Sequence, residues 1–256
     1  MRFFLVVLII FFSCSHKPLH TSTPKPFTYS HGAIIRGDST QKKIALVFTG
    51  DEFGDGGELI AKTLQEQNVK ATFFLTGRFY KNPQFKSIIE QLKKDGHYLG
   101  AHSHDHLLYC DWSERDSLLV TKEEFKTDLL KNYEAMQPFG IKMKDAPFFL
   151  PPFEWYNDSI AAWTKELSLQ LINFTPGTLS HADYTTPDAK NYRGSETIYQ
   201  SITTYEKNKG LKGFILLMHI GTDPKRTDKF YHYLPQLIQR LQENNYGLVT
   251  VNELLK

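Results

Sequence analysis

Apolar runs alternate with stretches of helical spacing from about residue 43 to the end of the chain. The runs predict short strands at 44–48, 71–75, 97–100, 147–150, 169–174, 213–218 and 248–251. Apolar positions with helical spacing predict helices at 58–67, 83–94, 121–137, 157–167, 195–208 and 227–243. About seven β/α pairs without an internal repeat predict a single α/β domain. We expect a distorted (β/α) barrel, similar to a TIM barrel, in preference to an open doubly wound sheet.

Two helix ends carry local signals. The helix predicted over 83–94 stops before Gly96, and a glycine there is typical of a helix C-terminus. Thr121 stands three residues before Glu124, which is the spacing of a capping box. We therefore expect the next helix to begin at Thr121.

The N-terminus differs from the rest of the chain. Residues 3–12 are apolar and follow Arg2, but a run of this length is too short to cross a bilayer, which takes about 20 helical residues. The pattern predicts a signal peptide over residues 1–13. Cys14 then resembles the lipid-accepting cysteine of bacterial lipoproteins. We expect residues 14–31, rich in Pro, Ser, Thr, Lys and His, to form a lipidated tether, and residues 32–256 to form the folded domain.

This interpretation places the protein in the bacterial cell envelope, held to the membrane by its N-terminal lipid alone. Lipidation of Cys14 leaves Cys110 without a partner, so that the domain folds without a disulfide. A disulfide between Cys14 and Cys110 is the alternative.

Composition narrows the possible partners. The 256 residues are 41% hydrophobic, enough for one sizeable core. Lys and Arg number 30 against 28 Asp and Glu, and they form no cluster that suits a phosphate backbone, so no nucleic acid partner is expected. The glycines at 54, 56 and 57 match no nucleotide-binding fingerprint. We expect a monomer.

Polar clusters follow the predicted strands where each strand ends. They are Asp51 and Glu52 after the first strand, His102 to His106 after the third, Pro152 to Trp155 after the fourth, residues 173–184 at the fifth, and His219 after the sixth. Barrel enzymes build their sites from the carboxyl ends of several strands. We therefore expect these residues to meet at one mouth of the barrel.

His102 and His106 lie four residues apart, a spacing that lets two imidazoles hold one divalent cation. Asp51 is the best candidate for an anionic third ligand. The expected metal is zinc, with cobalt, nickel or manganese also compatible. His104 is expected to be a surface residue beside Asp105.

Two nitrogens and one carboxylate leave open positions for water and a substrate carbonyl, which is the arrangement of a metal-dependent hydrolase. A protonated His219 at the same mouth is able to give a proton to the departing amine or alkoxide. A lone histidine after an apolar strand is as often structural, so its expected position supports the role more than its identity does.

The chain resembles the NodB-homology polysaccharide deacetylases, carbohydrate esterase family 4, over residues 43–255. The segment 68–74 (NVKATFF) resembles the second strand of the family, residues 96–106 its His-Ser/Thr-x-x-x-His metal motif, and 217–219 its Leu-x-His motif. The resemblance implies a distorted (β/α) barrel, a zinc-like metal held by Asp, His and His, and removal of acetyl groups from a polysaccharide.

The first family motif, Thr-Phe-Asp-Asp-Gly, is altered. Aligned on the strand, residues 47–51 (VFTGD) lose both aspartates. Counted back from Ala71, with a one-residue bulge, Asp51 falls on the metal-binding aspartate and Gly50 on the catalytic base. We favour the second count because it keeps the anionic ligand. Neither count leaves an acid at the base position.

The third motif, Arg-Pro-Pro-Tyr-Gly, is here residues 150–154 (LPPFE), without its arginine. The resemblance implies that this arginine pairs with the base aspartate. Because both residues are absent here, neither leaves an unpaired buried charge. Three other carboxylates are candidates for the base: Glu52, which we choose, Asp55 and Glu154. Alternatively, a metal-bound hydroxide acts without a base. The backbone N–H of Phe153 is the expected oxyanion contact, in a substrate-binding segment with Pro152 and Trp155.

The fourth motif is altered as well, at 175–177 and 182–184. Asp183 is a candidate to orient His219, and a loop aspartate that makes only local turn bonds is the alternative.

The leading hypothesis is therefore a metal-dependent hydrolase that removes N-acetyl or O-acetyl groups from an acetylated glycan. A catalytically degenerate carbohydrate-binding protein of the same fold is the main alternative, and an amidase with a non-sugar substrate is a third.

Overall fold

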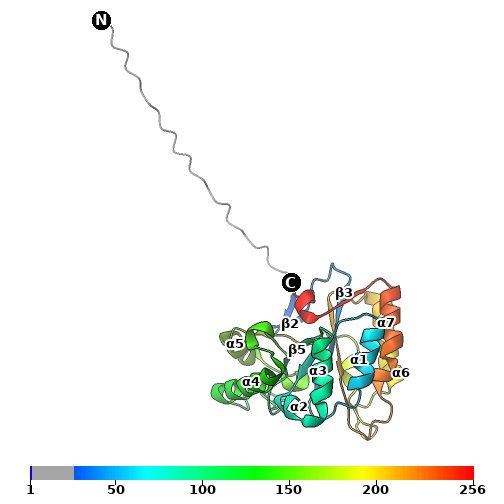
Figure 1. Ribbon diagram of the computed structural model, residues 1–256, viewed down its shortest axis with the longest axis horizontal. Helices are drawn as coiled ribbons and strands as arrows, with labels where there is room; N and C mark the ends of the chain where they lie inside the picture. Colours follow the sequence, from blue (N-terminus) through cyan, green and yellow to red (C-terminus); the bar gives the residue numbers. More distant parts are fainter. Residues whose placement is uncertain (2–25) are drawn as a thin grey trace.

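The computed structural model describes Met1 and residues 26–256. Within these residues nine strands form one curled, mixed sheet in the order β1-β2-β8-β3-β4-β5-β6-β7, and β9 pairs with β3 (Figure 1). The strands are β1 Thr28–Ser30, β2 Ala33–Arg36, β3 Lys43–Gly50, β4 Thr72–Leu75, β5 Tyr98–Ala101, β6 Phe148–Phe149, β7 Gln170–Leu171, β8 Phe214–His219 and β9 Gly247–Val249. Strands β3 to β9 are mutually parallel, whereas β1 and β2 are antiparallel. A bridge from Ile34 to Ile172 brings the far edge back to β2, which confirms the distorted barrel.

The central strand is β3, in which no side chain from Ile44 to Phe48 is more than 1% exposed. Strand β8 pairs with it from Ile44 to Thr49. On its other side β9 pairs with the first part of β3, and β4 pairs with Val47 to Gly50. Because β3 has neighbours on both edges, its carboxyl end is held firmly beside those of β4 and β8.

Helices surround the sheet (Figure 1). They are α1 Gly57–Glu66, α2 Gly77–Lys81, α3 Lys86–Lys94, α4 Lys122–Met136, α5 Asp158–Glu166, α6 Ser195–Lys209, α7 Leu234–Glu243 and α8 Val251–Leu254. In the view of Figure 1, α4 and α5 lie on one flank and α1, α6 and α7 on the other. None of the described helices has the length and apolarity needed to span a bilayer.

The helix start predicted at Thr121 is confirmed as a complete capping box. The Thr121 side chain accepts a hydrogen bond from the Glu124 N–H, and the Glu124 carboxylate accepts one from the Thr121 N–H. Asn157 caps α5 in the same way, because its side-chain oxygen accepts from the Ile160 N–H at 3.1 Å. These contacts satisfy N–H groups that have no partner inside the helix.

Some elements differ from the prediction. The helix expected over 227–243 begins as α7 at Leu234, after a short 3-10 turn, because Pro235 lacks the N–H that a helix interior needs. The strand expected at 248–251 ends at Val249, since Val251 starts α8. Strands β1 and β2 and helix α2 were not predicted, because three to five residues are too few to show a period.

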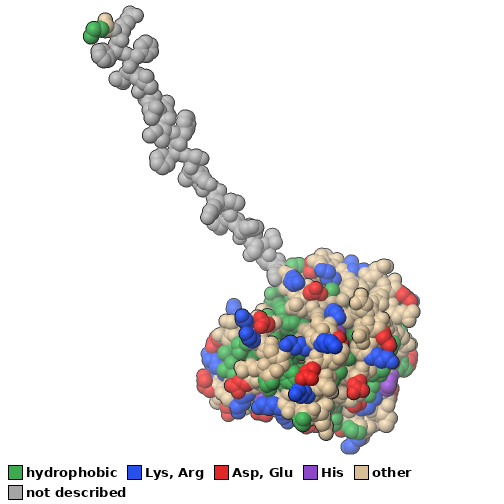
Figure 2. Space-filling view, viewed as in Figure 1, with side chains coloured by type: hydrophobic (Ala, Val, Ile, Leu, Met, Phe, Trp, Pro, Cys, Tyr) green, Lys and Arg blue, Asp and Glu red, His purple; other side chains and the backbone are tan. Residues whose placement is uncertain are grey.

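The predicted signal peptide and Cys14 lie outside the described residues. Strand β1 pairs with β2, so the ordered fold starts a few residues before the expected boundary at Gly32. Cys110 is buried and forms no disulfide among the described residues. Figure 2 shows basic and acidic side chains interspersed on the visible face of the molecule, which suits the near-neutral net charge of +2.

Candidate active site

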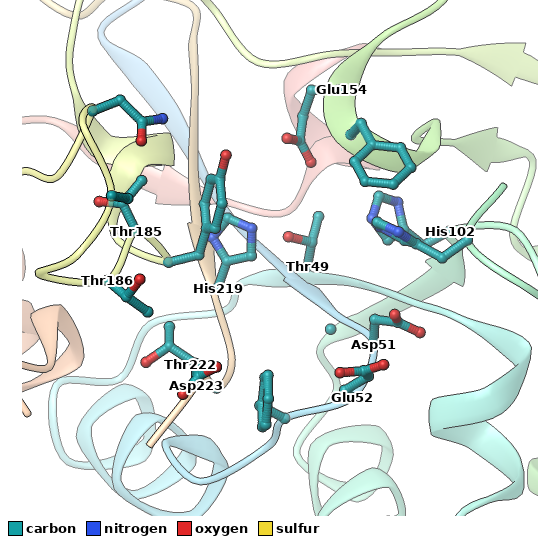
Figure 3. A pocket seen from close by; sticks show the side chains of 18 of the residues that line it. Thr49, Asp51, Glu52, His102, Glu154, Thr185, Thr186, His219, Thr222 and Asp223 are labelled. Carbon is teal, nitrogen blue, oxygen red and sulfur yellow. The ribbon is translucent and has the colours of Figure 1, made fainter. Parts of the chain in front are cut away.

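A cavity of about 590 Å³ opens at the carboxyl ends of β3, β5 and β8 (Figure 3). It is lined by Thr49, Gly50, Asp51, Glu52, Phe53, His102, His106, Trp112, Phe153, Glu154, Tyr184, Thr185, Thr186, Ala189, Asn191, His219, Gly221, Thr222 and Asp223. The polar clusters after the first, third, fourth and sixth predicted strands therefore meet at one mouth, as the order of the strands indicated.

His219, the last residue of β8, is oriented by Asp183. Its Nδ1 lies 2.6 Å from Asp183 Oδ1, and its backbone N–H donates to Asp183 Oδ2 at 2.9 Å. Asp183 is only 2% exposed. Burial lowers the pKa of His219, but the charge and hydrogen bond of Asp183, with the charge of Glu154, outweigh burial and raise that pKa above its ordinary value. The pair therefore favours an imidazolium that presents Nε2 as a proton donor.

His102 and His106 follow β5 and face each other, with ring centroids 5.1 Å apart. His102 Nδ1 lies 2.8 Å from the carbonyl oxygen of Leu150, which leaves Nε2 available to a ligand. Burial lowers the pKa of His102 to about 3, and that of His106 to about 4. Both rings are therefore neutral at pH 7, the form that binds metals.

Asp51, the expected third ligand, contacts other groups. Arg78 at the start of α2 donates to Asp51 through Nε at 3.2 Å and Nη2 at 2.5 Å, and the Thr76 hydroxyl donates to it at 2.9 Å. No group of three or more His, Cys, Asp or Glu among the described residues is arranged to hold a metal ion. The histidine pair thus fits a divalent cation, and the carboxylate does not complete the set as it stands.

The one-residue bulge that the favoured alignment required is absent from β3. The pairing of β3 with β8 and with β4 runs without a shift as far as Gly50. Thr49, opposite His219 in that register, lines the cavity, and its buried hydroxyl has no hydrogen-bond partner. A side chain at Gly50 would meet Ile220 at 2.6 Å and Leu75 at 2.8 Å. The strand alignment, in which both aspartates are replaced, is the one that the pairing supports.

The three candidate bases differ in position. Glu52 is exposed at the rim of the cavity. Asp55 lies outside it and accepts hydrogen bonds from the Thr222 N–H at 2.8 Å and the Tyr231 hydroxyl at 2.9 Å, beside Lys229 Nζ at 3.1 Å. Glu154 is half-buried inside the cavity, where burial raises its pKa to about 7 and the charge of His219 acts against that shift. Position therefore favours Glu154 over Glu52, our first choice.

The segment after β6 contributes fewer cavity residues than expected. Phe153 lines the cavity and stacks near His106, with ring centroids 4.4 Å apart. Pro152 and Trp155 do not line it: Pro152 is buried, and the Trp155 Nε1–H donates to the carbonyl oxygen of Asp111 at 3.0 Å. In this structure both side chains support the loop, and contact of these two residues with substrate stays a prediction.

Two aromatic residues of the rim were not named as substrate contacts, although Tyr184 belongs to the cluster 173–184 that was expected at the mouth. Trp112 is 55% exposed beside Phe153, and Tyr184 is 48% exposed beside the ring of His219. Their positions in the loops after β5 and β7 gave no periodic signal. Proximity in the sequence to His106 and to Asp183 was the available indication.

The expectation for His104 was also wrong. It is 9% exposed and packs over Gly77, where any Cβ would lie 1.8 Å from His104 Nδ1. Its backbone N–H donates to Asp128 Oδ1 at 3.2 Å. His104 therefore supports the loop that carries His102 and His106, the two candidate metal ligands.

Comparison with known proteins agrees with this geometry. A family model described as polysaccharide deacetylase matches residues 36–172. Peptidoglycan-N-acetylglucosamine deacetylase of Bacillus cereus is 25% identical over 219 residues, which cover 85% of this chain and 90% of that protein. The fold is similar to that of the Bc1960 peptidoglycan N-acetylglucosamine deacetylase, with a TM-score of 0.69, 18% identity, and coverage of 88% of this chain and 93% of that one.

The fold is also similar to that of BA3943 of Bacillus anthracis, described as a pseudoenzyme of carbohydrate esterase family 4. The TM-score is 0.67 and the identity 21%, over 89% of this chain and 70% of that one. A mutant of BA3943 is described as having restored enzymatic activity. Since the family model spans more than half of the 256 residues and the matched segment includes strands β3 to β7, the chain belongs to the polysaccharide deacetylase family.

Proposed function

We propose that this protein is a hydrolase that removes acetyl groups, from an N-acetyl amide or an O-acetyl ester, on a glycan of the bacterial cell envelope. The observation that carries the proposal is that the His219–Asp183 pair opens onto the same cavity as the neutral His102–His106 pair. The similarity to a bacterial peptidoglycan deacetylase supports the substrate class.

His219 acts as the general acid in this reaction. Its Nδ1 is occupied by Asp183, so the proton on Nε2 is available to the departing nitrogen or oxygen. A protonated leaving group is expelled as a neutral amine or alcohol, which lowers the barrier to bond cleavage. The raised pKa of His219 keeps this proton in place near neutral pH.

His102 and His106 would hold a divalent cation, with zinc the first choice, and Asp51 would complete the set once it leaves its ion pair with Arg78. When bound by these histidines, such a cation would supply Lewis-acid polarisation of the acetyl carbonyl. The Phe153 N–H, which donates to no acceptor among the described residues, is the proposed oxyanion contact. Phe153, Trp112 and Tyr184 give the cavity an aromatic rim that suits the apolar faces of sugar rings.

We further propose, from the sequence pattern of residues 1–14, that the protein is exported and held to the membrane by a lipid on Cys14, and that it acts as a monomer. Labelling with a radioactive fatty acid tests the anchor, because Cys14→Ser removes the only acceptor proposed.

A second candidate function is glycan binding without hydrolysis. It is favoured by Thr49 and Gly50 at the end of β3, where the family pattern has two aspartates, and by the similarity in fold to a pseudoenzyme. Retention of the buried His219–Asp183 pair argues against it, because a binding protein gains nothing from an oriented proton donor.

Acetate release by the full chain, loaded with zinc or cobalt, on a panel of N-acetylated and O-acetylated oligosaccharides tests the proposal. Release that is lost in His219→Ala supports the deacetylase. No release from any member, together with oligosaccharide binding by calorimetry, would establish the binding protein instead.

A further inference from the structure

Glu154 occupies an unusual backbone position above the cavity. Phe153 and Glu154 have φ angles of 57° and 53°, in the left-handed region that side chains other than glycine rarely adopt. The Glu154 N–H donates to the carbonyl oxygen of Pro151 at 3.1 Å, and its own carbonyl accepts from the Asn173 side chain at 2.7 Å. The surrounding chain therefore fixes a strained conformation, which is a common feature of functional sites.

This conformation directs the Glu154 carboxylate into the cavity. Figure 3 shows the carboxylate pointing inward between His219 and His102, towards Thr49. It makes no hydrogen bond or ion pair with any described residue. The groups that face it are His219 at the end of β8, and Asp183 and Tyr184 from the loop after β7. Burial raises the pKa of Tyr184, and the charge of Glu154 raises it further.

Thr49 lies across the cavity from the Glu154 carboxylate (Figure 3). It is 1% exposed, and its hydroxyl lacks a hydrogen-bond partner in the part of the chain described. A buried polar group without a partner is costly, unless a water or ligand satisfies it. A water molecule bound between the Thr49 hydroxyl and the Glu154 carboxylate would have polar partners on both sides and would lie next to the proton donor His219 (Figure 3).

The other carboxylates of the cavity are less suited to activate such a water. Asp51 is held by Arg78 and Thr76, and Asp223 accepts from the Lys225 N–H at 2.8 Å. Glu52 is exposed at the rim and does not reach the interior of the cavity. Glu154 combines an inward direction, partial burial and freedom from protein partners.

We infer that Glu154 is the general base of this site and acts opposite the acid His219; the inference rests on the proposed function. Glu154 takes one proton from water as the water oxygen bonds to the acetyl carbonyl carbon. His219 then gives its Nε2 proton to the leaving nitrogen or oxygen as the bond from that atom to the carbonyl carbon breaks. The products are acetic acid, which releases its proton to solvent and becomes acetate, and the free amine or alcohol; solvent carries the proton from Glu154 back to His219. The carboxylate base that is absent from the end of β3 is thus supplied by Glu154, in the loop after β6.

The test compares Glu154→Gln with two other glutamates in the full chain, by acetate release across pH. Glu154→Gln keeps the size of the side chain and removes the base, so kcat falls by about 100-fold or more with little change in KM. The acidic limb of the wild-type pH profile, expected where Glu154 becomes protonated near pH 7, disappears. Glu90→Gln on the outer face of α3 leaves the rate unchanged.

A second variant guards against a folding defect. Thr49→Asp combined with Glu154→Gln places a carboxylate on the opposite wall of the same space. If Glu154 acts as a base, kcat of the double variant is about tenfold higher than that of Glu154→Gln alone. An unaffected kcat in Glu154→Gln, or loss of the acidic limb in Glu52→Gln instead, would overturn the inference while leaving the deacetylase proposal intact. A wild-type chain that releases no acetate removes the proposed function and the inference with it.

Discussion

Arg78 binds both carboxylate oxygens of Asp51, with Nε 3.2 Å from Oδ1 and Nη2 2.5 Å from Oδ2. The guanidinium thereby occupies the carboxylate that we propose as the third ligand of a metal site with His102 and His106. Arg78 comes from α2, directly after β4, so the contact joins the ends of two neighbouring strands.

We expect Arg78→Ala to bind zinc more tightly than the wild type, because Asp51 no longer has to leave its ion pair. The Arg78 side chain is 45% exposed, so the pair contributes only about 0.2–1 kcal/mol, and the gain in Kd is about 1.4-fold to fivefold. Isothermal titration calorimetry measures it. Lys62→Ala on the surface of α1 is the control, and equal affinities in all three proteins would show that Asp51 takes no part in binding.

Asp183→Asn should lower activity by about 100-fold, because the amide neither fixes the imidazole of His219 nor stabilises its charge. Asp183 raises the pKa of His219, so its removal lowers that pKa. The acid form is then lost at a lower pH, and the basic limb of the pH profile moves to lower pH. Asp188→Asn, an exposed residue of the same loop, should leave the profile in place, and the same shift in both variants would contradict the role of Asp183.

The parallel barrel could be predicted because its signals are local and periodic. The buried run from Ile44 to Phe48 indicated a central strand, and the Thr121–Glu124 pair marked a helix start to the residue. Convergence of His102, His106 and His219 followed from strand order alone, since the carboxyl ends of parallel strands share one edge of the sheet.

The contacts around Asp51 could not be predicted, because Arg78 reaches it from another element and leaves no mark in the spacing. The position of Trp155 was misjudged for a similar reason. Its indole packs under the Arg115 guanidinium, 3.6 Å from the ring centroid, and away from the cavity. Side-chain direction in an irregular loop depends on tertiary contacts that adjacency in the sequence does not reveal.

His97 should make the fold less stable in acid. Burial, with the charge of Lys70, lowers the pKa of His97 to about 4, whereas an exposed histidine in the unfolded chain titrates near 6.5. The unfolded state therefore binds more protons between these values, and stability falls as the pH falls. From pH 7 to pH 5 the loss is about 2 kcal/mol.

Urea unfolding at the two pH values measures this loss in the wild type and in His97→Gln. The variant should lose less stability between pH 7 and pH 5, although it is weaker at pH 7, because the Ala71 N–H donates to His97 Nδ1 at 3.1 Å. An identical pH dependence in both proteins would show that other groups, such as the remaining buried histidines, account for the acid sensitivity.

Trp112→Ala should raise KM for an acetylated oligosaccharide without a matching fall in kcat. Trp112 is 55% exposed at the rim and contacts Phe153, with ring centroids 5.7 Å apart, whereas the acid and the histidine pair lie deeper in the cavity. A stacking contact of about 0.5–1.5 kcal/mol corresponds to roughly a two- to tenfold rise in KM. A small aryl acetate, which is too short to reach the rim from the acetyl position, should be hydrolysed equally by both proteins. Since Tyr29 is equally exposed on β1, Tyr29→Ala is the matched control. An equal loss on both substrates would mean that Trp112 supports the loop of His106 rather than the glycan.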